Sequence, residues 1–190
     1  MERSRLKSVV ESLLFVSESA VTLERMSGLL EGVERKEILS VVEELRSEYE
    51  AQGRGFCLVE VASGFQMRTP KENADWVKSF LRGRAARMSR ATLETMAIIA
   101  YKQPVTRVEI EQVRGVGIEG VLSTLMERSL VRIVGRKDIP GRPFLYSTTR
   151  DFLELFGLND LTGLPTLKEM EEVSLPQIPE NETPAAESEE

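Results

Sequence analysis

Residues 114–122 read Arg-Gly-Val-Gly-Ile-Glu-Gly-Val-Leu, and how this stretch folds decides the class of the protein. Gly115, Gly117 and Gly120 have the G-x-G-x-x-G spacing of a loop that binds a dinucleotide pyrophosphate. Such a loop follows a strand that is buried on both faces and rich in Val, Ile and Leu. Residues 107–114 instead carry two carboxylates and two arginines. We therefore expect a turn between two helices here, and no bound cofactor.

The residues on either side of the turn predict a helix before it and a helix after it. Thr106 and Glu109 have the spacing of a capping box, in which both side chains bind free amides at a helix start. We expect Gly115 and Gly117 to form the turn, and Gly120 to let the second helix pack closely against a neighbour. The second helix carries an apolar stripe made of Ile118, Val121, Leu122, Leu125 and Met126.

The rest of the second half predicts a further helix before this pair and a hairpin after it. Ser89 can cap a helix whose apolar face would consist of Leu93, Met96, Ala97 and Ala100. The strand-like runs 131–134 and 144–147 predict the hairpin, and residues 148–157 a last short helix.

The first half of the chain has the same order of elements. Thr22 can cap the second of three helices. The three apolar stripes are Leu6, Val9, Val10, Leu13 and Leu14; Leu23, Met26, Leu29 and Leu30; and Ile38, Val41, Val42, Leu45 and Tyr49. Residues 56–62 and 65–69 then alternate as strands do, and residues 63–64 (Ser-Gly) predict the hairpin loop because Gly accepts a positive φ.

Three helices followed by a hairpin therefore occur twice, which is the order of a winged helix. The predicted fold class is mainly α (α+β), with two tandem winged-helix domains, each of three helices plus a β-hairpin wing. We place the N-terminal winged helix at residues 1–82, with a short helix around Trp76 near its end. An Arg-rich linker follows at 83–88, the C-terminal winged helix at 89–167, and an acidic disordered tail at 168–190.

Charge and composition exclude several classes of protein. The formal net charge is −6, and residues 158–190 account for it with one basic and nine acidic side chains. The chain has no histidine and a single cysteine, Cys57, so we expect no catalytic residues and no metal site. No apolar run approaches the roughly 20 residues that span a bilayer. The N-terminus also lacks the pattern of a secretory signal, and we therefore expect a cytoplasmic protein without a membrane segment.

A DNA-binding winged-helix regulator is the alternative that the pattern leaves open. A helix that reads the major groove usually presents Arg, Lys, Asn or Gln to the bases. The polar positions of the predicted third helix of the second half are Glu119, Ser123, Thr124, Glu127 and Arg128. Acidic side chains repel phosphates, whereas arginines in the linker and in the second wing could bind them. We expect any contact with DNA to be indirect or weak.

Several longer stretches carry a resemblance to a known family. At residues 93–107, 114–116, 135–146, 148–149 and 152–158 the chain closely resembles the bacterial segregation and condensation protein B family. The resemblance covers the second half densely, and the first half in pattern and length only.

The resemblance implies a non-enzymatic winged-helix partner in the bacterial condensin complex built on a structural-maintenance-of-chromosomes (SMC) ATPase. Such a protein forms a homodimer through its first winged helix. It binds the kleisin subunit, segregation and condensation protein A, which bridges the ATPase heads. The implied role is chromosome condensation and segregation during the cell cycle, in the cytoplasm and associated with the nucleoid.

Residue types suggest where these partners would bind. Arg and Tyr are common interface anchors, and the predicted kleisin surface consists of Tyr101, Arg114, Arg136, Arg142 and Tyr146. The alternative is that Arg136 and Arg142 brace the wing and Tyr146 belongs to the core. For the homodimer, the predicted contacts on the first hairpin are Leu58, Phe65 and Met67.

Four leucines follow the last predicted helix at intervals of three residues, at positions 158, 161, 164 and 167. Gly163 and Pro165 exclude a long helix over this segment. We expect it to lie over the core of the second domain, with a free partner motif as the alternative.

Overall fold

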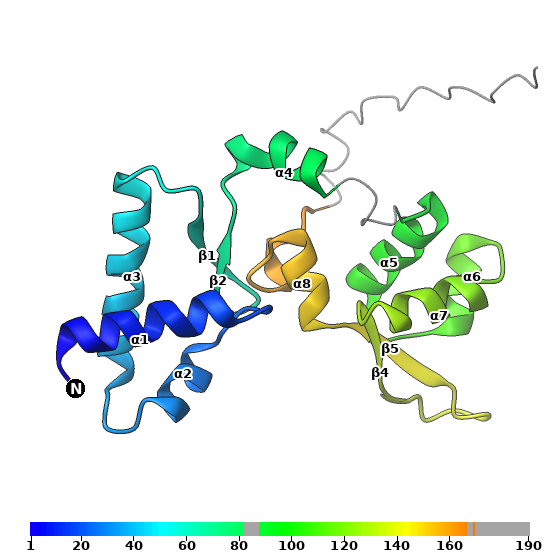
Figure 1. Ribbon diagram of the computed structural model, residues 1–190. Helices are drawn as coiled ribbons and strands as arrows, with labels where there is room; N and C mark the ends of the chain where they lie inside the picture. Colours follow the sequence, from blue (N-terminus) through cyan, green and yellow to red (C-terminus); the bar gives the residue numbers. More distant parts are fainter. Residues whose placement is uncertain (82–87, 167–168, 170–190) are drawn as a thin grey trace, which may run out of the picture.

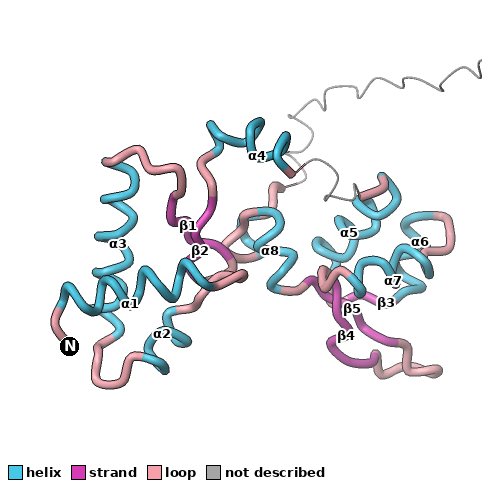
Figure 2. The backbone as a smooth tube through the Cα atoms, in the orientation of Figure 1, coloured by secondary structure: helices cyan, strands magenta, loops and turns pink. Residues whose placement is uncertain are grey.

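The computed structural model describes residues 1–81, 88–166 and 169, which form a mainly helical, mixed α/β protein with two small sheets (Figures 1 and 2). Two separate hydrophobic cores correspond to the two halves of the chain. We call residues 3–68 the first unit and residues 90–148 the second unit. The predicted linker and tail lie outside the described residues, apart from Met88 and Glu169, and the domain boundaries stay a prediction.

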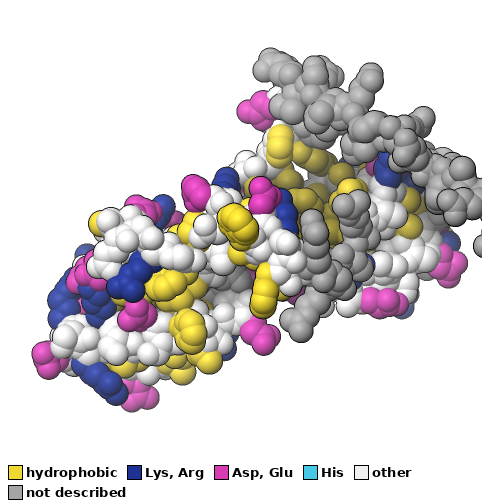
Figure 3. Space-filling model, turned by 45° about the horizontal axis from the view of Figure 1, so that its top comes forward, with side chains coloured by type: hydrophobic (Ala, Val, Ile, Leu, Met, Phe, Trp, Pro, Cys, Tyr) yellow, Lys and Arg dark blue, Asp and Glu magenta, His cyan; other side chains and the backbone are white. Residues whose placement is uncertain are grey.

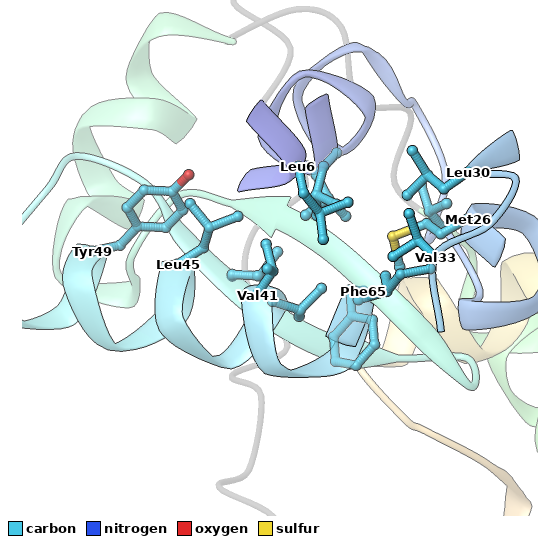
Figure 4. Packing of buried hydrophobic residues seen from close by; sticks show 14 residues of the cluster. Leu6, Met26, Leu30, Val33, Val41, Leu45, Tyr49 and Phe65 are labelled. Atoms are coloured by element: carbon cyan, nitrogen blue, oxygen red, sulfur yellow. The ribbon is translucent and has the colours of Figure 1, made fainter. Parts of the chain in front are cut away.

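The first unit consists of α1 (Arg3–Val16), α2 (Leu23–Leu29), α3 (Arg35–Ala51) and the hairpin of β1 (Cys57–Val61) and β2 (Gly64–Arg68). Figure 4 shows side chains from the helices and the hairpin, such as Leu6, Val41 and Phe65, meeting in one core. The hydroxyl of Thr22 accepts a hydrogen bond from the amide of Arg25, which confirms the predicted cap of α2.

The predicted stripes of the first unit are wrong at one residue. Leu29 is 60% exposed, while Met26 and Leu30 on the same short segment are buried. Met26 and Leu30, four residues apart, lie in the core and Leu23 packs against it, whereas Leu29 lies on another side of the helix α2 and points away from it.

The turn of the first hairpin is one residue earlier than the sequence predicted. Gly64 pairs with Val61 inside the ladder, and Ala62 and Ser63 form the loop with φ of 50° and 54°. Positive φ at both loop positions is the geometry of a type I′ turn. Gly64 is needed for another reason: a Cβ there would lie 2.8 Å from the carbonyl oxygen of Val21, whose backbone bonds to Phe65.

A short helical segment follows the hairpin, made of η1 (Lys71–Asn73) and α4 (Ala74–Phe80). Among the described elements, η1 is the only one with which α4 makes substantial contact. In Figure 1, α4 accordingly stands apart from the bodies of both units.

The second unit repeats the helical order and adds a strand. It contains α5 (Arg90–Lys102), β3 (Val105–Thr106), α6 (Arg107–Arg114), α7 (Glu119–Glu127), β4 (Val131–Arg136) and β5 (Phe144–Thr148). The three strands form an antiparallel sheet in the order β3-β5-β4. The sequence did not predict β3, because a two-residue strand has no readable alternation.

The glycine-rich stretch is a helix–turn–helix connection. The capping box of Thr106 and Glu109 begins α6, and Gly115 ends that helix with φ of 71°. The prediction for Gly120 is wrong, because a Cβ at this position of α7 would meet nothing within 4 Å. No close helix contact therefore requires a glycine there.

The buried face of α5 also differs from the predicted one. Met96 and Ala100 are buried as expected, but Leu93 and Ala97 are exposed. Thr92 and Thr95 occupy the buried face instead, at 6% and 0% exposure. A stripe read from apolar residues alone misses threonines, whose methyl groups pack in a core. The hydroxyl of Thr92 lies 2.8 Å from that of Ser89, whereas the Thr95 hydroxyl is buried without a hydrogen-bond partner among the described residues.

Gln103 connects the end of α5 to β5. Its side-chain oxygen accepts hydrogen bonds from the amide of Thr148 (2.7 Å), from the Thr148 hydroxyl (2.9 Å) and from the Ser147 hydroxyl. The peptide between Gln103 and Pro104 is cis. One side chain thus fixes the register between the helix and the central strand.

The last elements are α8 (Arg150–Phe156) and η2 (Leu161–Gly163). Leu158 and Leu164 pack against the core of the second unit, which confirms the expectation for these two leucines. Leu161 is 41% exposed, and position 167 lies outside the described residues. Among the described helices, none is both long and apolar enough to cross a membrane.

Replacing Gly64 and Gly120 by alanine should have opposite effects. Gly64→Ala forces a Cβ against the Val21 carbonyl and should lower the free energy of unfolding by about 1–3 kcal/mol. Gly120→Ala enters open space in a helix and should raise it by roughly 0.5–1 kcal/mol. Urea unfolding followed by circular dichroism measures both, and a stabilising Gly64→Ala would contradict the packing described for the hairpin.

Candidate interaction surfaces

The five side chains predicted to bind a kleisin have very different surroundings. Tyr146 is 7% exposed within the second core, and the Arg114 side chain is 13% exposed and ion-paired with Glu94. Tyr101 is 42% exposed, and its hydroxyl donates to the carbonyl of Pro165 at 2.6 Å. Arg136 and Arg142 are exposed at the tip of the second hairpin. Only Tyr101, Arg136 and Arg142 therefore present substantial surface to a partner.

The tip of the second hairpin is a turn held by side-chain and backbone contacts. The guanidinium of Arg136 lies 4.0 Å from the centre of the Phe144 ring and donates to the carbonyl of Arg142 at 3.1 Å. The amide of Lys137 donates to the carbonyl of Pro143 at 2.9 Å. Ile139 and Phe144 are exposed beside these arginines, at 45% and 40%. The tip thus offers a basic and partly apolar surface of defined shape.

An ion pair holds this hairpin to α6. Lys137 Nζ lies 2.5 Å from a carboxylate oxygen of Glu109, whose other oxygen accepts from the amide and hydroxyl of Thr106. The interaction with Lys137, together with the bonds from Thr106, lowers the pKa of Glu109 from its ordinary 4.5 to about 2. One carboxylate therefore serves both the helix cap and the wing.

The outward face of α7 is acidic. Glu119 and Glu127 are exposed along it with Gly120, Ser123 and Met126, and the exposed Arg128 follows at its C-terminal end. Arg107 neutralises part of this charge, because it pairs with Glu119 at 3.5 Å and with Glu111 on its own helix at 2.8 Å. A face of this charge is unsuited to the phosphates and base edges of a major groove.

The side chains predicted to form a dimer contact lie mostly inside the first unit. Leu58 is 3% exposed and Phe65 8%, both in the first core, with Met67 packed against it. The face of the first hairpin that carries them is thereby covered by the chain itself. Two such buried side chains have little surface to offer a second copy.

The exposed apolar side chains of the first unit lie elsewhere, at the corner of α1 and α2. Phe15 is 80% exposed, Val16 75% and Leu29 60%. A hollow of about 290 Å³ at this corner is lined by Leu13, Val16, Val21 and Leu29 together with polar neighbours. Phe15 and Val16 lie outside the core-facing stripe of α1, which is the signal in the sequence that could have identified this surface.

The second face of the first hairpin is covered by α8. The side chain of Glu154 is 13% exposed. Its carboxylate accepts hydrogen bonds from the backbone amide of Ala20 at 3.0 Å and from the side-chain amide of Gln66 at 3.5 Å. Arg68 donates to the carbonyl of Glu154 at 2.6 Å, and Arg150 donates to the carbonyl of Ala20 at 3.0 Å. Figure 1 shows α8 between the first hairpin and the second unit.

The chain after α8 continues this junction. The amides of Ala62 and Ser63 donate to the carbonyls of Leu158 and Asn159 at 2.8 and 3.0 Å. The side-chain amide of Asn159 donates to the carboxylate of Glu60 at 3.1 Å. The loop of the first hairpin is thus held by backbone and side-chain bonds to a segment nearly 100 residues away.

A groove of about 950 Å³ remains beside this junction. Its walls come from the end of α3, from β1, from η1 and from the C-terminal end of α8. Within residues 1–81, 88–166 and 169, no three His, Cys, Asp or Glu side chains gather closely enough to hold a metal ion.

The comparisons with known proteins agree on one family. The family model described as "Segregation and condensation complex subunit ScpB" matches residues 8–167. The chain is 49% identical over 174 residues to segregation and condensation protein B of Syntrophotalea carbinolica, covering 92% of this chain and 88% of the relative. It is 47% identical over 165 residues to the protein of that name from Moorella thermoacetica, covering 87% and 84%.

One solved structure is described as a dimer of the ScpB N-terminal domain complexed with ScpA peptide. It is 33% identical to the chain and covers 40% of it and 95% of the solved chain, with a TM-score of 0.38.

Removing the Glu154 carboxylate should loosen the junction. Glu154→Ala leaves the amide of Ala20 without its partner and should cost about 1–3 kcal/mol. Glu154→Gln keeps an oxygen acceptor and should retain most of the stability. Hydrogen exchange at the Ala20 amide measures the effect: faster exchange in the Ala variant than in the Gln variant is expected, and equal protection in both would contradict it.

The depressed pKa of Glu109 predicts a pH-dependent contribution to stability. A carboxyl group whose pKa is lower in the folded than in the unfolded state stabilises the fold above the unfolded pKa. This contribution should be present at neutral pH and be lost as the pH falls from about 4.5 to about 2. Thermal unfolding of wild type and Glu109→Gln over this range checks it: the difference between them should shrink as the pH falls, and a constant difference would contradict the assignment.

Proposed function

The chain belongs to the ScpB family of segregation and condensation complex subunits, and on this premise we propose that it is a non-catalytic subunit of a bacterial condensin complex. In this proposal it binds and stabilises the kleisin subunit, segregation and condensation protein A, on the heads of the SMC ATPase. Its role is chromosome condensation and segregation, and its place is the cytoplasm, at the nucleoid.

The proposed fold behind this function is a pair of tandem winged-helix domains, 1–82 and 89–167, joined by the Arg-rich linker 83–88. The repeated order of three helices and a hairpin supports it. The observation from this chain's own structure that carries the proposal is the acidic outward face of α7, with Glu119 and Glu127. A winged helix with this face is suited to docking proteins and unsuited to reading DNA.

The kleisin would bind to the second unit. Arg136 and Arg142 at the wing tip, and Tyr101 on α5, are exposed and combine charge with aromatic area. Arg114 and Tyr146 would support this surface from behind, through the ion pair with Glu94 and through core packing. The first unit together with α4 would form the homodimer, since they carry the most exposed large apolar side chains of the described chain, such as Phe15 and Phe80.

Light scattering of the purified chain, alone and with its kleisin, tests the proposal. A dimer that gains mass with the kleisin and ignores duplex DNA at physiological salt supports it. A chain that ignores the kleisin and binds duplex tightly would overturn it in favour of a DNA-binding regulator acting through the arginines of the linker and the second wing.

Changing single residues of the proposed kleisin surface should weaken the complex. Arg142→Glu and Tyr101→Ala should each raise the Kd for the kleisin roughly tenfold or more, since exposed Arg and Tyr anchors often contribute this much. Arg5→Glu makes the same charge change on exposed α1 and should leave the Kd unchanged. Calorimetric titration measures all three, and unchanged affinity in both test variants would remove the assignment.

A further inference from the structure

Aromatic side chains line the groove of about 950 Å³ where the first unit meets α8. Tyr49 and Phe56 form one part of the lining, with their ring centres 4.8 Å apart, and Phe56 is partly exposed. Leu155 and Phe156 of α8 form another part and are 51% and 46% exposed. Figure 3 shows hydrophobic side chains among charges of both signs on the side of the molecule that carries α4. Partly exposed aromatic side chains that gather in a groove are typical of a surface that another segment covers.

The charged side chains around the groove favour an acidic occupant. Three basic side chains line it without forming an ion pair to any residue that the structure describes: Arg54, Arg68 and Lys71. Of the three carboxylates in the lining, that of Glu50 pairs with Arg46 at 3.5 Å. That of Glu60 accepts a hydrogen bond from the side-chain amide of Asn159 at 3.1 Å, so that Glu72 is the only acidic member without such a partner. A segment with apolar side chains next to negative charge would complement this surface.

One segment of the chain beyond the described part has these properties. Residues 175–180 read Leu-Pro-Gln-Ile-Pro-Glu. Two prolines three residues apart, each preceded by an apolar residue, favour the extended polyproline II conformation, and segments with this spacing bind grooves lined by aromatic side chains. Glutamates flank the apolar residues on both sides, at positions 171, 172, 180 and 182.

The length of the chain lets this segment reach the groove of its own molecule. Pro165, whose carbonyl is bonded to the hydroxyl of Tyr101, lies nine residues after Phe156, so the two backbones are at most roughly 32 Å apart. Leu175 lies ten residues after Pro165, and an extended chain of this length spans up to about 35 Å. The segment can therefore return to Phe156 without any change in the described part of the chain.

We propose that residues 175–180 bind in the groove of the same molecule. Leu175 and Ile178 contact its aromatic lining, and Glu180 lies towards the basic side chains. Because the segment is tethered, its effective concentration at the groove is on the order of millimolar, and weak contacts are enough to keep it bound.

The bound segment touches both halves of the chain, since the groove is lined by the first unit and by α8. It therefore closes over their junction from outside. For these residues the proposal replaces the expectation of a disordered tail. It goes beyond the proposed kleisin complex and does not depend on it, because the occupant and the groove belong to one molecule.

Disulfide formation with the single cysteine tests the proposal, because Cys57 lines the groove. In the full chain, Ile178→Cys places a second thiol on the proposed segment, and Ala185→Cys places one farther along. Mild oxidation should link position 178 to Cys57 within one molecule at least about ten times faster than position 185. A tail without a preferred site would give only about a twofold difference, because the probability of loop closure falls slowly with chain length.

Peptide mapping without reduction, together with the mass of the oxidised product, identifies the link. Both variants on a Cys57→Ser background are the controls and should give no intramolecular disulfide. Rates that differ by only about twofold between Ile178→Cys and Ala185→Cys would overturn the inference. A product of twice the 21.4 kDa chain mass would also overturn it, because the segment would then bind to another molecule.

The reactivity of the Cys57 thiol gives a second test in a chain without added cysteines. The double variant Leu175→Glu, Ile178→Glu should release the segment and raise the rate at which a neutral maleimide modifies Cys57 about fivefold or more, because reaction in the wild type requires local opening. The double variant Ala185→Glu, Ala186→Glu makes the same charge change outside the segment and should react as the wild type does. Equal rates in the two double variants would contradict the proposal.

Discussion

The contacts of Glu154 on α8 fix how the two halves of the chain meet. The carboxylate accepts from the amide of Ala20, while Arg68 binds the carbonyl of Glu154 and Arg150 binds the carbonyl of Ala20. Only 13% of the Glu154 side chain is exposed, so the groups that bind its carboxylate depend on it: its removal leaves them unsatisfied at a cost larger than the net gain of the bond. The relative position of the two units follows from this small polar cluster and from the Asn159 contacts beside it.

Because of the contacts between α8 and the first unit, the two hairpins differ in how far they are covered by the rest of the chain. The first is covered on one face by its own core, through Leu58 and Phe65, and on the other by α8, where Val61 packs near Leu153. It therefore acts as an internal layer between the units and has no free wing. The second hairpin keeps an exposed tip, shaped by the stacking of Arg136 on Phe144. A partner that recognises a wing would find only the second one available.

Apolar exposure is distributed in the same unequal way. The first unit and α4 carry Phe15, Trp76 and Phe80, which are 80%, 79% and 88% exposed, whereas Ile139 and Phe144 of the second unit, next to arginines, are 45% and 40% exposed. Large apolar surfaces suit a permanent contact such as that between identical copies, and mixed charged surfaces suit a contact with a different subunit. This difference agrees with an assembly subunit that uses its two halves for two kinds of partner.

The sequence by itself determined the local structure and the family. The caps at Thr22, Ser89 and Thr106 depend on neighbours within four residues, and they were predicted correctly for that reason, as was most of each helical stripe. What failed depended on distant groups. The need for Gly64 comes from Val21 and Arg150, the buried face of α5 from the packing of its threonines, and the burial of Leu58 from the first core. The interaction surfaces were decided only by the tertiary structure, because whether an apolar or charged side chain is free for a partner depends on which segment of the same chain already covers it.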